Sequence, residues 1–171
     1  DTPGHEAFSA MRARGANTTD IVILVVAAND SVKPQTIEAI THAKAAEVPI
    51  IVAINKIDLD AADIDKVKGD LAKYELVPED WGGKNQMIPV SAISKEGIDS
   101  LLDAIVLESE LLELKAPLEG KATGVILESE LDRFKGPLGT FLVQKGVLKV
   151  GDIVVAAEKK GKIKSLINSS G

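Results

Sequence analysis

The chain has 171 residues, of which 45% are hydrophobic and 27% charged, and it contains no cysteine. This composition is typical of a globular protein and argues against disorder, and the lack of cysteine excludes disulfides, thiolate metal sites and thiol catalysis. The net charge of −6 is uneven, because residues 1–120 carry −10 and residues 121–171 carry +4. The acidic first part is poorly suited to nucleic acid, whereas the basic second part could meet a phosphate backbone.

Targeting signals are missing from the sequence as given. The longest apolar run, residues 21–28, is too short to span a bilayer, and no charged and apolar leader precedes Asp1. We therefore expect a cytoplasmic protein with no membrane partner.

The first 115 residues alternate between two kinds of pattern. Apolar runs rich in β-branched residues occupy residues 21–28, 49–54 and 87–90, and such runs are typical of parallel strands buried on both faces. Helical patterns cover residues 6–14, 34–47, 63–74 and 97–114. The last helix is predicted to form one apolar stripe from Ile98, Leu101, Leu102, Ile105 and Leu112. The alternation predicts an α/β domain over residues 1–115, with a parallel sheet flanked by helices.

The pattern changes from residue 116 onward. Strand-like runs follow at residues 122–130, 138–144, 153–157 and 162–167, separated by glycine-bearing turns. Short strands at this spacing predict a partial antiparallel β-barrel over residues 116–171, with open edges. Four lysines near the end form either an RNA-facing cluster or a solvated edge: Lys159, Lys160, Lys162 and Lys164.

The first motif stands at the beginning of the chain, in Asp1-Thr2-Pro3-Gly4-His5. An aspartate at a strand end can hold Mg²⁺ through water, and a glycine lets its N–H approach a γ-phosphate. An imidazole beside that glycine could position the water that attacks GTP. The alternative is that Asp-x-x-Gly is only a turn.

The second motif, Asn55-Lys56-Ile57-Asp58, directly follows an apolar run, so it is expected at the carboxyl end of a buried strand, where open α/β sheets bind ligands. Guanine presents its N1–H and 2-amino group side by side, and Asp58 could accept both, whereas adenine offers no such pair. Asn55 would bond to the base edge or tie loops together, and the Lys56 stem would cover the base. The alternative is a polar loop that caps a strand.

Ser91-Ala92-Ile93 follows the next apolar run. Here the Ala92 N–H could bond to guanine O6, and the Ser91 hydroxyl could orient Asp58. Together the three motifs outline a pocket for GTP or GDP. No Gly-x-x-x-x-Gly-Lys-Ser/Thr phosphate loop occurs in the sequence. We therefore interpret the chain as the later part of a GTPase, which alone should hydrolyse no GTP and bind guanine nucleotides weakly or not at all.

Longer stretches narrow the family. The run from Asp1 to Phe8, the run from Met11 to Ala16 and the segments at residues 50–58, 81–83 and 113–116 together resemble bacterial-type translation initiation factor two, a translational GTPase, over essentially the whole chain. Residues 145–152 resemble the second domain of translational GTPases, a β-barrel that contacts ribosomal RNA.

The resemblance implies roles for individual residues. Asp1 and Gly4 would serve Mg²⁺ and the γ-phosphate, and His5 would position the attacking water once the ribosome triggers hydrolysis. Guanine would be held by the later loops, at Asn55, Lys56, Asp58, Ser91, Ala92 and Ile93. The parent protein would be a GTPase that binds the ribosome, promotes subunit joining and places initiator tRNA through regions outside this chain, with no DNA partner.

Three residues depart from the family pattern: Ser31 replaces a usual glycine, Lys33 an apolar residue, and Ile93 a lysine or leucine. Two other functions remain open. The parent could be an elongation or release factor, or the chain could be a non-catalytic module that binds guanine nucleotide or the ribosome.

Overall fold

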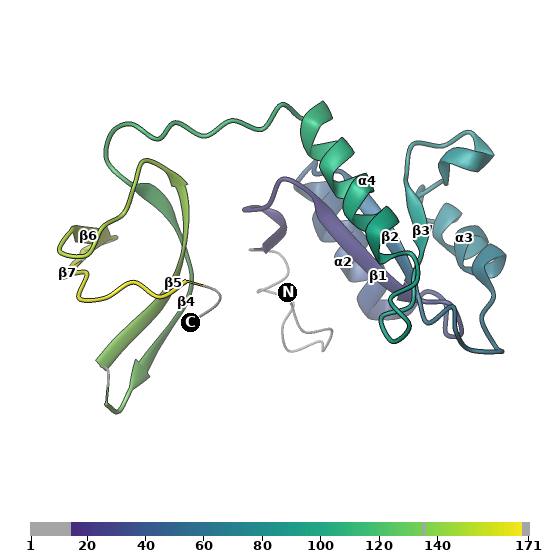
Figure 1. Cartoon of the computed structure of the whole chain (residues 1–171), viewed down its shortest axis with the longest axis horizontal. Helices are drawn as coiled ribbons and strands as arrows, with labels where there is room; N and C mark the ends of the chain where they lie inside the picture. The colour runs from purple at the N-terminus through teal and green to yellow at the C-terminus, as the bar shows by residue number, and fades with distance from the viewer. Residues whose placement is uncertain (1–14, 135, 169–171) are drawn as a thin grey trace. The chain divides into compact units, whose positions relative to one another are not determined.

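The computed structural model describes residues 15–134 and 136–168 (Figure 1). The chain divides into two compact units, Asp1–Leu114 and Lys115–Gly171, and each is described by itself. The helix expected at residues 6–14 lies outside the described residues. None of the described helices is long and apolar enough to cross a membrane.

The first unit is built on a three-stranded parallel sheet in the order β1 (Val22–Ala27), β2 (Ile50–Asn55), β3 (Met87–Pro89). The register pairs Val22 with Ile50 and Val52 with Met87. β-Branched side chains suit this pleated surface. The predicted parallel sheet is therefore confirmed, with strand boundaries within one residue of those expected from the apolar runs.

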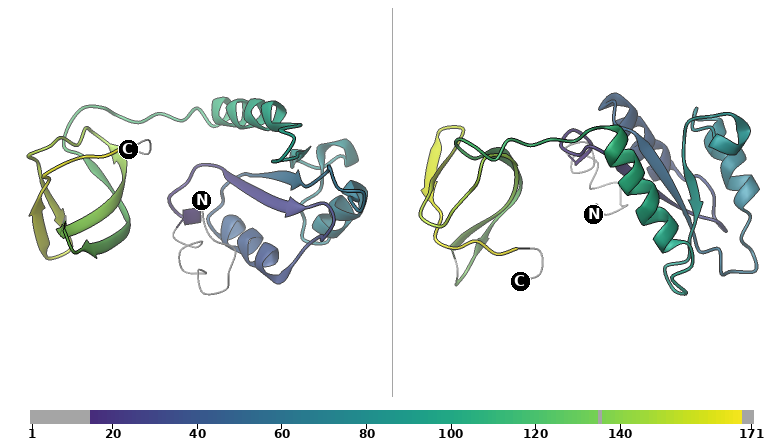
Figure 2. Two further views of the ribbon diagram at one scale, coloured as in Figure 1. Left: turned by 60° about the horizontal axis from the view of Figure 1, so that its bottom comes forward. Right: turned by 45° about the horizontal axis from the view of Figure 1, so that its top comes forward.

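Three helices flank this sheet, α2 (Pro34–Ala45), α3 (Ile64–Ala72) and α4 (Ile98–Leu111). In Figures 1 and 2, α4 lies on one face of the sheet and α2 and α3 lie on the other. Pro34 occupies the first helical position of α2, where the missing N–H costs nothing. Asp63 caps α3, because its side chain accepts a hydrogen bond from the Lys66 N–H at 2.9 Å. These elements confirm the predicted α/β architecture.

The hydrophobic core lies between the sheet and the pair α2 and α3. Alternate side chains of β1 and β2 point into it and meet the apolar stripes of the two helices. Its best-buried members come from the central strand and from α3: Val52, Ile54, Val67 and Leu71. The central strand β2 is thus held by packing as well as by hydrogen bonds on both of its edges.

The opposite face of the sheet, under α4, is less covered by the described residues. Ala104 is the one fully buried residue of α4, whereas Leu102 is 54% exposed and Val25 of β1 is 61% exposed. The expected apolar stripe on α4 is therefore only partly buried, and its members Leu102 and Leu112 are exposed. The helix also ends at Leu111, three residues earlier than expected.

The second unit contains two antiparallel hairpins. One pairs β4 (Thr123–Asp132) with β5 (Gly136–Lys145), and the other pairs β6 (Ile153–Ala156) with β7 (Lys159–Lys162). The antiparallel pairing confirms the expected strand type. The last strand, however, was placed too late, at residues 162–167. The two-residue turn at Ala157 and Glu158 brings Lys159 opposite Ala156, so β7 begins before the apolar run.

Candidate functional site

Two loops meet at the carboxyl edge of the sheet. One is formed by residues 55–58, beginning with the last residue of β2, and the other by residues 91–97, after β3. The Val90 N–H donates to the Ile54 carbonyl at 2.8 Å, and the Ile57 N–H donates to the Val90 carbonyl at 3.4 Å. The turn after β1 joins them, because the Ala28 N–H donates to the Asn55 carbonyl at 2.7 Å. Parallel strands deliver all three loops to one edge, which is where open α/β sheets bind ligands.

Asn55 ties the two loops together through a single oxygen. Its Oδ1 accepts hydrogen bonds from the N–H of Lys56 at 2.7 Å and from the N–H of Ala92 at 3.1 Å. Lys56 adopts a left-handed backbone with φ of 65°, and its side chain is exposed. An amide whose oxygen is engaged in this way keeps its NH₂ group as a donor for a ligand. Of the two roles expected for Asn55, the tying of loops is therefore present in the structure.

Asp58 is held by a serine beneath it. The Ser91 hydroxyl donates to Asp58 Oδ1 at 2.6 Å, and Ser91 Oγ accepts from the Ser94 N–H at 3.1 Å. Ser91 is fully buried, whereas Asp58 is exposed. A hydroxyl that accepts from a backbone N–H has its one proton left to donate, so the carboxylate of Asp58 is aimed outward from a buried anchor.

The backbone N–H of Ala92 has a different partner from the one expected from the sequence. The Ala92 N–H, expected to meet guanine O6, donates to Asn55 in this structure. A bond to O6 would therefore be shared with Asn55 in a three-centre arrangement. Ile93 is 85% exposed, so its side chain packs little against the described residues.

Two residues that the sequence reasoning missed shape the second loop. The Glu96 carbonyl accepts a hydrogen bond from the Ser91 N–H at 2.9 Å, which closes the loop on itself. Gly97 then turns the chain into α4 with φ of 71°. The sequence held no local signal for this role of Gly97, since left-handed glycines are typical of the ends of helices and not of their starts.

The structure explains how Ser31 can stand where a glycine was expected. Ser31 takes a left-handed backbone with φ of 65°, a conformation that favours the glycine which the family resemblance leads us to expect at this position. Its hydroxyl donates to Asp70 Oδ2 of α3. The pKa of Asp70 lies below its ordinary value, first because Lys73 donates a hydrogen bond to it and second because Ser31 does. The loop after β1 is thereby fastened to α3.

The phosphate end of the expected site is not part of this description, because Asp1, Gly4 and His5 lie outside the described residues. Within residues 15–134 and 136–168, no group of three or more histidines and carboxylates is gathered to hold a metal ion. The loops that carry Asn55, Asp58 and Ser91 are therefore the part of the expected site that the structure describes.

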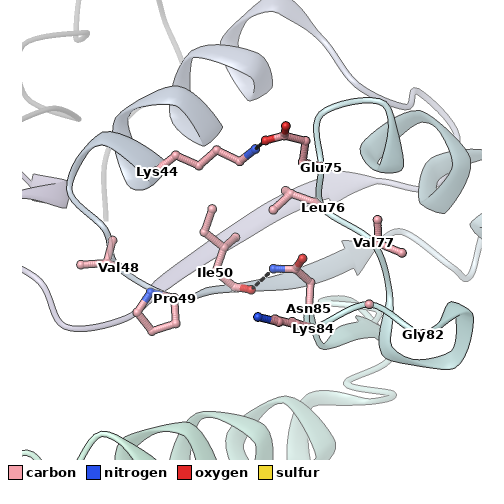
Figure 3. Close-up of a pocket in the computed structure, with 11 residues that line it drawn as sticks. Lys44, Val48, Pro49, Ile50, Glu75, Leu76, Val77, Gly82, Lys84 and Asn85 are labelled. Carbon is pink, nitrogen blue, oxygen red and sulfur yellow. Dashed lines mark hydrogen bonds and ion pairs between the residues drawn. The ribbon is translucent and has the colours of Figure 1, made fainter.

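A separate hollow of about 430 Å³ lies at the opposite edge of the sheet. Figure 3 shows its lining at the amino end of β2, where Asn85 donates to the Ile50 carbonyl at 3.3 Å and Lys44 pairs with Glu75 at 2.6 Å. Ile50 and Asn55 are the first and last residues of β2, five positions apart, which corresponds to roughly 16 Å along the strand. This hollow is therefore distinct from the loops that carry Asn55 and Asp58.

The carboxyl-edge loops have the chemistry for guanine. Asp58 is exposed, and its carboxylate, held through Oδ1 by Ser91, can accept from two adjacent donors, while Asn55 offers an amide donor for the base edge. Adenine lacks the adjacent pair of donors, so its binding would leave the carboxylate without partners, which is unfavourable. The residues present therefore fit a guanine base.

Comparison with known proteins agrees with this geometry. Residues 1–110 match the family described as the elongation factor Tu GTP binding domain. The chain belongs to this family. Residues 121–171 match a second family, elongation factor G domain 2, which begins close to the boundary between the two compact units.

Two curated relatives of the chain carry the same name. The chain is 61% identical over its full 171 residues to translation initiation factor IF-2 of Stigmatella aurantiaca, and 60% identical over the same length to that of Clostridium botulinum. It spans 16% and 25% of these two relatives, respectively. The resemblance to bacterial-type initiation factor two is therefore confirmed.

Solved structures resemble the chain as well. GDP-bound aIF5B from Aeropyrum pernix matches with a TM-score of 0.71 and 30% identity, over 90% of this chain and 31% of that one. The elongation factor SelB from Methanococcus maripaludis, in complex with the GTP analogue GPPNHP, matches with a TM-score of 0.67 and 27% identity, over 90% and 34% of the two chains. The fold is thus shared with translational GTPases.

Proposed function

We propose that this chain is part of a GTP-hydrolysing translation initiation factor and that it supplies the guanine-recognition loops. The observation that carries the proposal is the network in which Asn55 joins the two loops and buried Ser91 orients Asp58. Residues 1–115 would form the later part of the GTP-binding domain, and residues 116–171 would begin the second-domain β-barrel. High identity to proteins named translation initiation factor IF-2 supports initiation over elongation or release.

In this proposal the base loops select the nucleotide and the amino-terminal motif senses its phosphates. Asp58 accepts hydrogen bonds from guanine N1–H and the 2-amino group, and Asn55 donates to the base edge. Asp1 would hold Mg²⁺ through water, Gly4 would meet the γ-phosphate, and His5 would position the attacking water. The role of His5 is tested by making His5→Ala in a longer protein that includes a phosphate loop. This variant should lose ribosome-stimulated GTP hydrolysis.

The partners follow from the same proposal. The parent protein works in the cytoplasm, binds the ribosome, promotes subunit joining and places initiator tRNA through regions outside this chain. The second unit would face ribosomal RNA, and the exposed lysines of β7 support this, because they belong to residues 121–171, the part of the chain with a positive net charge.

The base-recognition role is tested by replacing Asp58. Asp58→Ala should weaken the interaction of the chain with GDP by at least about tenfold, because a bidentate contact to a charged group is removed. Asp60→Ala is the matched control, since Asp60 is an exposed aspartate two residues away in the same segment. Titration followed by nuclear magnetic resonance suits this comparison, because it detects millimolar binding. Equal GDP binding by both variants would contradict the proposal.

A further inference from the structure

The loop that carries Ser91 owes its shape to backbone contacts. The Ser91 N–H bonds to the Glu96 carbonyl at 2.9 Å, and the Ser94 N–H bonds to Ser91 Oγ at 3.1 Å. Since the Ser91 hydroxyl is buried and already accepts from the loop, the loop conformation decides where its proton points. In this structure that proton is donated to Asp58.

Gly97 is the residue that allows this loop to close. A Cβ at Gly97 would lie 2.1 Å from the Pro89 carbonyl oxygen and 3.3 Å from the Val90 Cα. Both neighbours are backbone atoms at the end of β3, and Pro89 is paired with Ile54 of β2. They cannot move aside without displacing the strand end. Gly97 also has φ of 71°, a conformation that side chains disfavour.

We propose that Gly97 is a positioning residue for guanine selection. Because it has no side chain, the loop packs directly on the end of β3, and this packing aims the Ser91 hydroxyl at Asp58. The inference rests on the proposed recognition of guanine by Asp58. Gly97 itself touches no part of the base.

Base selectivity separates this role from a merely structural one. IDP differs from GDP only in lacking the 2-amino group, which is one of the two donors proposed to meet Asp58. The ratio of the dissociation constants for IDP and GDP therefore reports on how well Asp58 is aimed. A general loosening of the site would weaken both nucleotides by the same factor and leave the ratio unchanged.

The test compares Gly97→Ala with Gly82→Ala in the whole chain. Gly82 is a matched control, because it also has a positive φ, of 80°, but a Cβ there would meet nothing within 4 Å. Titrations with GDP and IDP, followed by nuclear magnetic resonance, should show the preference for GDP falling roughly tenfold or to parity in Gly97→Ala, the size expected for a charged hydrogen bond. Gly82→Ala should keep the preference.

Hydrogen exchange gives a second readout that needs no nucleotide. The N–H groups of Ser91 and Ser94 should exchange faster in Gly97→Ala, but not in Gly82→Ala, because the closed loop protects them. An unchanged ratio of GDP to IDP binding in Gly97→Ala would overturn the proposal, whether or not the exchange rates change.

The two hypotheses fail separately. If the native chain does not distinguish GDP from IDP, base recognition by Asp58 fails and the role of Gly97 in guanine selection fails with it, and the exchange rates then show only whether Gly97 keeps the loop closed. If Gly97→Ala does not fold, Ser91→Ala must reproduce the loss of GDP preference. Retention of that preference in Ser91→Ala would then refute the inference.

Discussion

At the scale of single residues, two oxygen atoms organise the candidate site. Asn55 Oδ1 joins the loops after β2 and β3 by accepting from one backbone N–H of each. Ser91 Oγ accepts from its own loop and donates to Asp58. Because each oxygen serves two partners, neither side chain can be shortened without releasing a loop or the carboxylate that the loop orients.

The contact of Ser31 and Lys73 with Asp70 predicts a pH-dependent stability. A carboxylate whose folded-state pKa lies below its ordinary value of 3.8 stabilises the fold above that value and loses the effect as the pH falls through the folded-state pKa. Asp70→Asn should therefore be less stable than the native chain at neutral pH, and the difference should shrink in acid. Denaturant unfolding at a series of pH values measures it.

Asp60→Asn is the control for this prediction, because Asp60 is exposed and forms no ion pair within the described part of the chain. A stability difference between Asp70→Asn and the native chain that stays constant down to the lowest pH would contradict the role given to Asp70.

At the scale of elements, the stabilising contacts are concentrated on one face of the sheet. α2 and α3 bury their apolar stripes against β1 and β2, whereas α4 leaves much of its apolar surface exposed to solvent. Burial of apolar surface is the dominant favourable term in folding. We therefore expect α3 to contribute far more than α4 to the stability of the first unit.

A pair of leucines tests this difference. Leu71 of α3 is 0% exposed and Leu102 of α4 is 54% exposed. Leu71→Ala should lower the free energy of unfolding by roughly 2–5 kcal/mol, because it removes buried methyl groups and leaves a cavity. Leu102→Ala should change it by about 0.5 kcal/mol or less. Similar losses in both variants, measured by denaturant unfolding, would show that α4 is buried in solution.

The elements were largely predictable from the sequence, because runs of β-branched residues and helical spacing are local signals. The strand and helix order followed from them, and so did the placement of Asn55, Asp58 and Ser91 at strand ends. The exposed side of α4 was not predictable, since helical periodicity shows that a stripe exists but not what covers it. The role of Gly97 was also hidden, because it depends on the close approach of Pro89, eight positions earlier in the sequence.

At the scale of the whole molecule, the two units differ in how they are held together. All the buried hydrophobic side chains among the described residues belong to the first unit. The described strands of the second unit pair as two separate hairpins, which bury little apolar surface. Two-stranded hairpins are marginal without further packing.

Hydrogen exchange should expose this difference. Amides of β2 are expected to exchange only through global unfolding of the first unit, whereas those of β4 and β5 should exchange through local opening, at least about a hundredfold faster. Exchange read by nuclear magnetic resonance on the whole chain gives both rates in one sample. Equal protection of β2 and β5 would mean that the second unit is as stable as the first.

The central claim is that the loops of Asn55, Asp58 and Ser91 recognise guanine. It is tested most directly by recording amide resonances of the native chain during titration with GDP and, separately, with ADP. We predict that GDP shifts the amides of residues 55–58 and 91–94 and that ADP at the same concentration leaves them in place. Shifts of equal size with ADP, or GDP-induced shifts confined to other residues, would contradict the account.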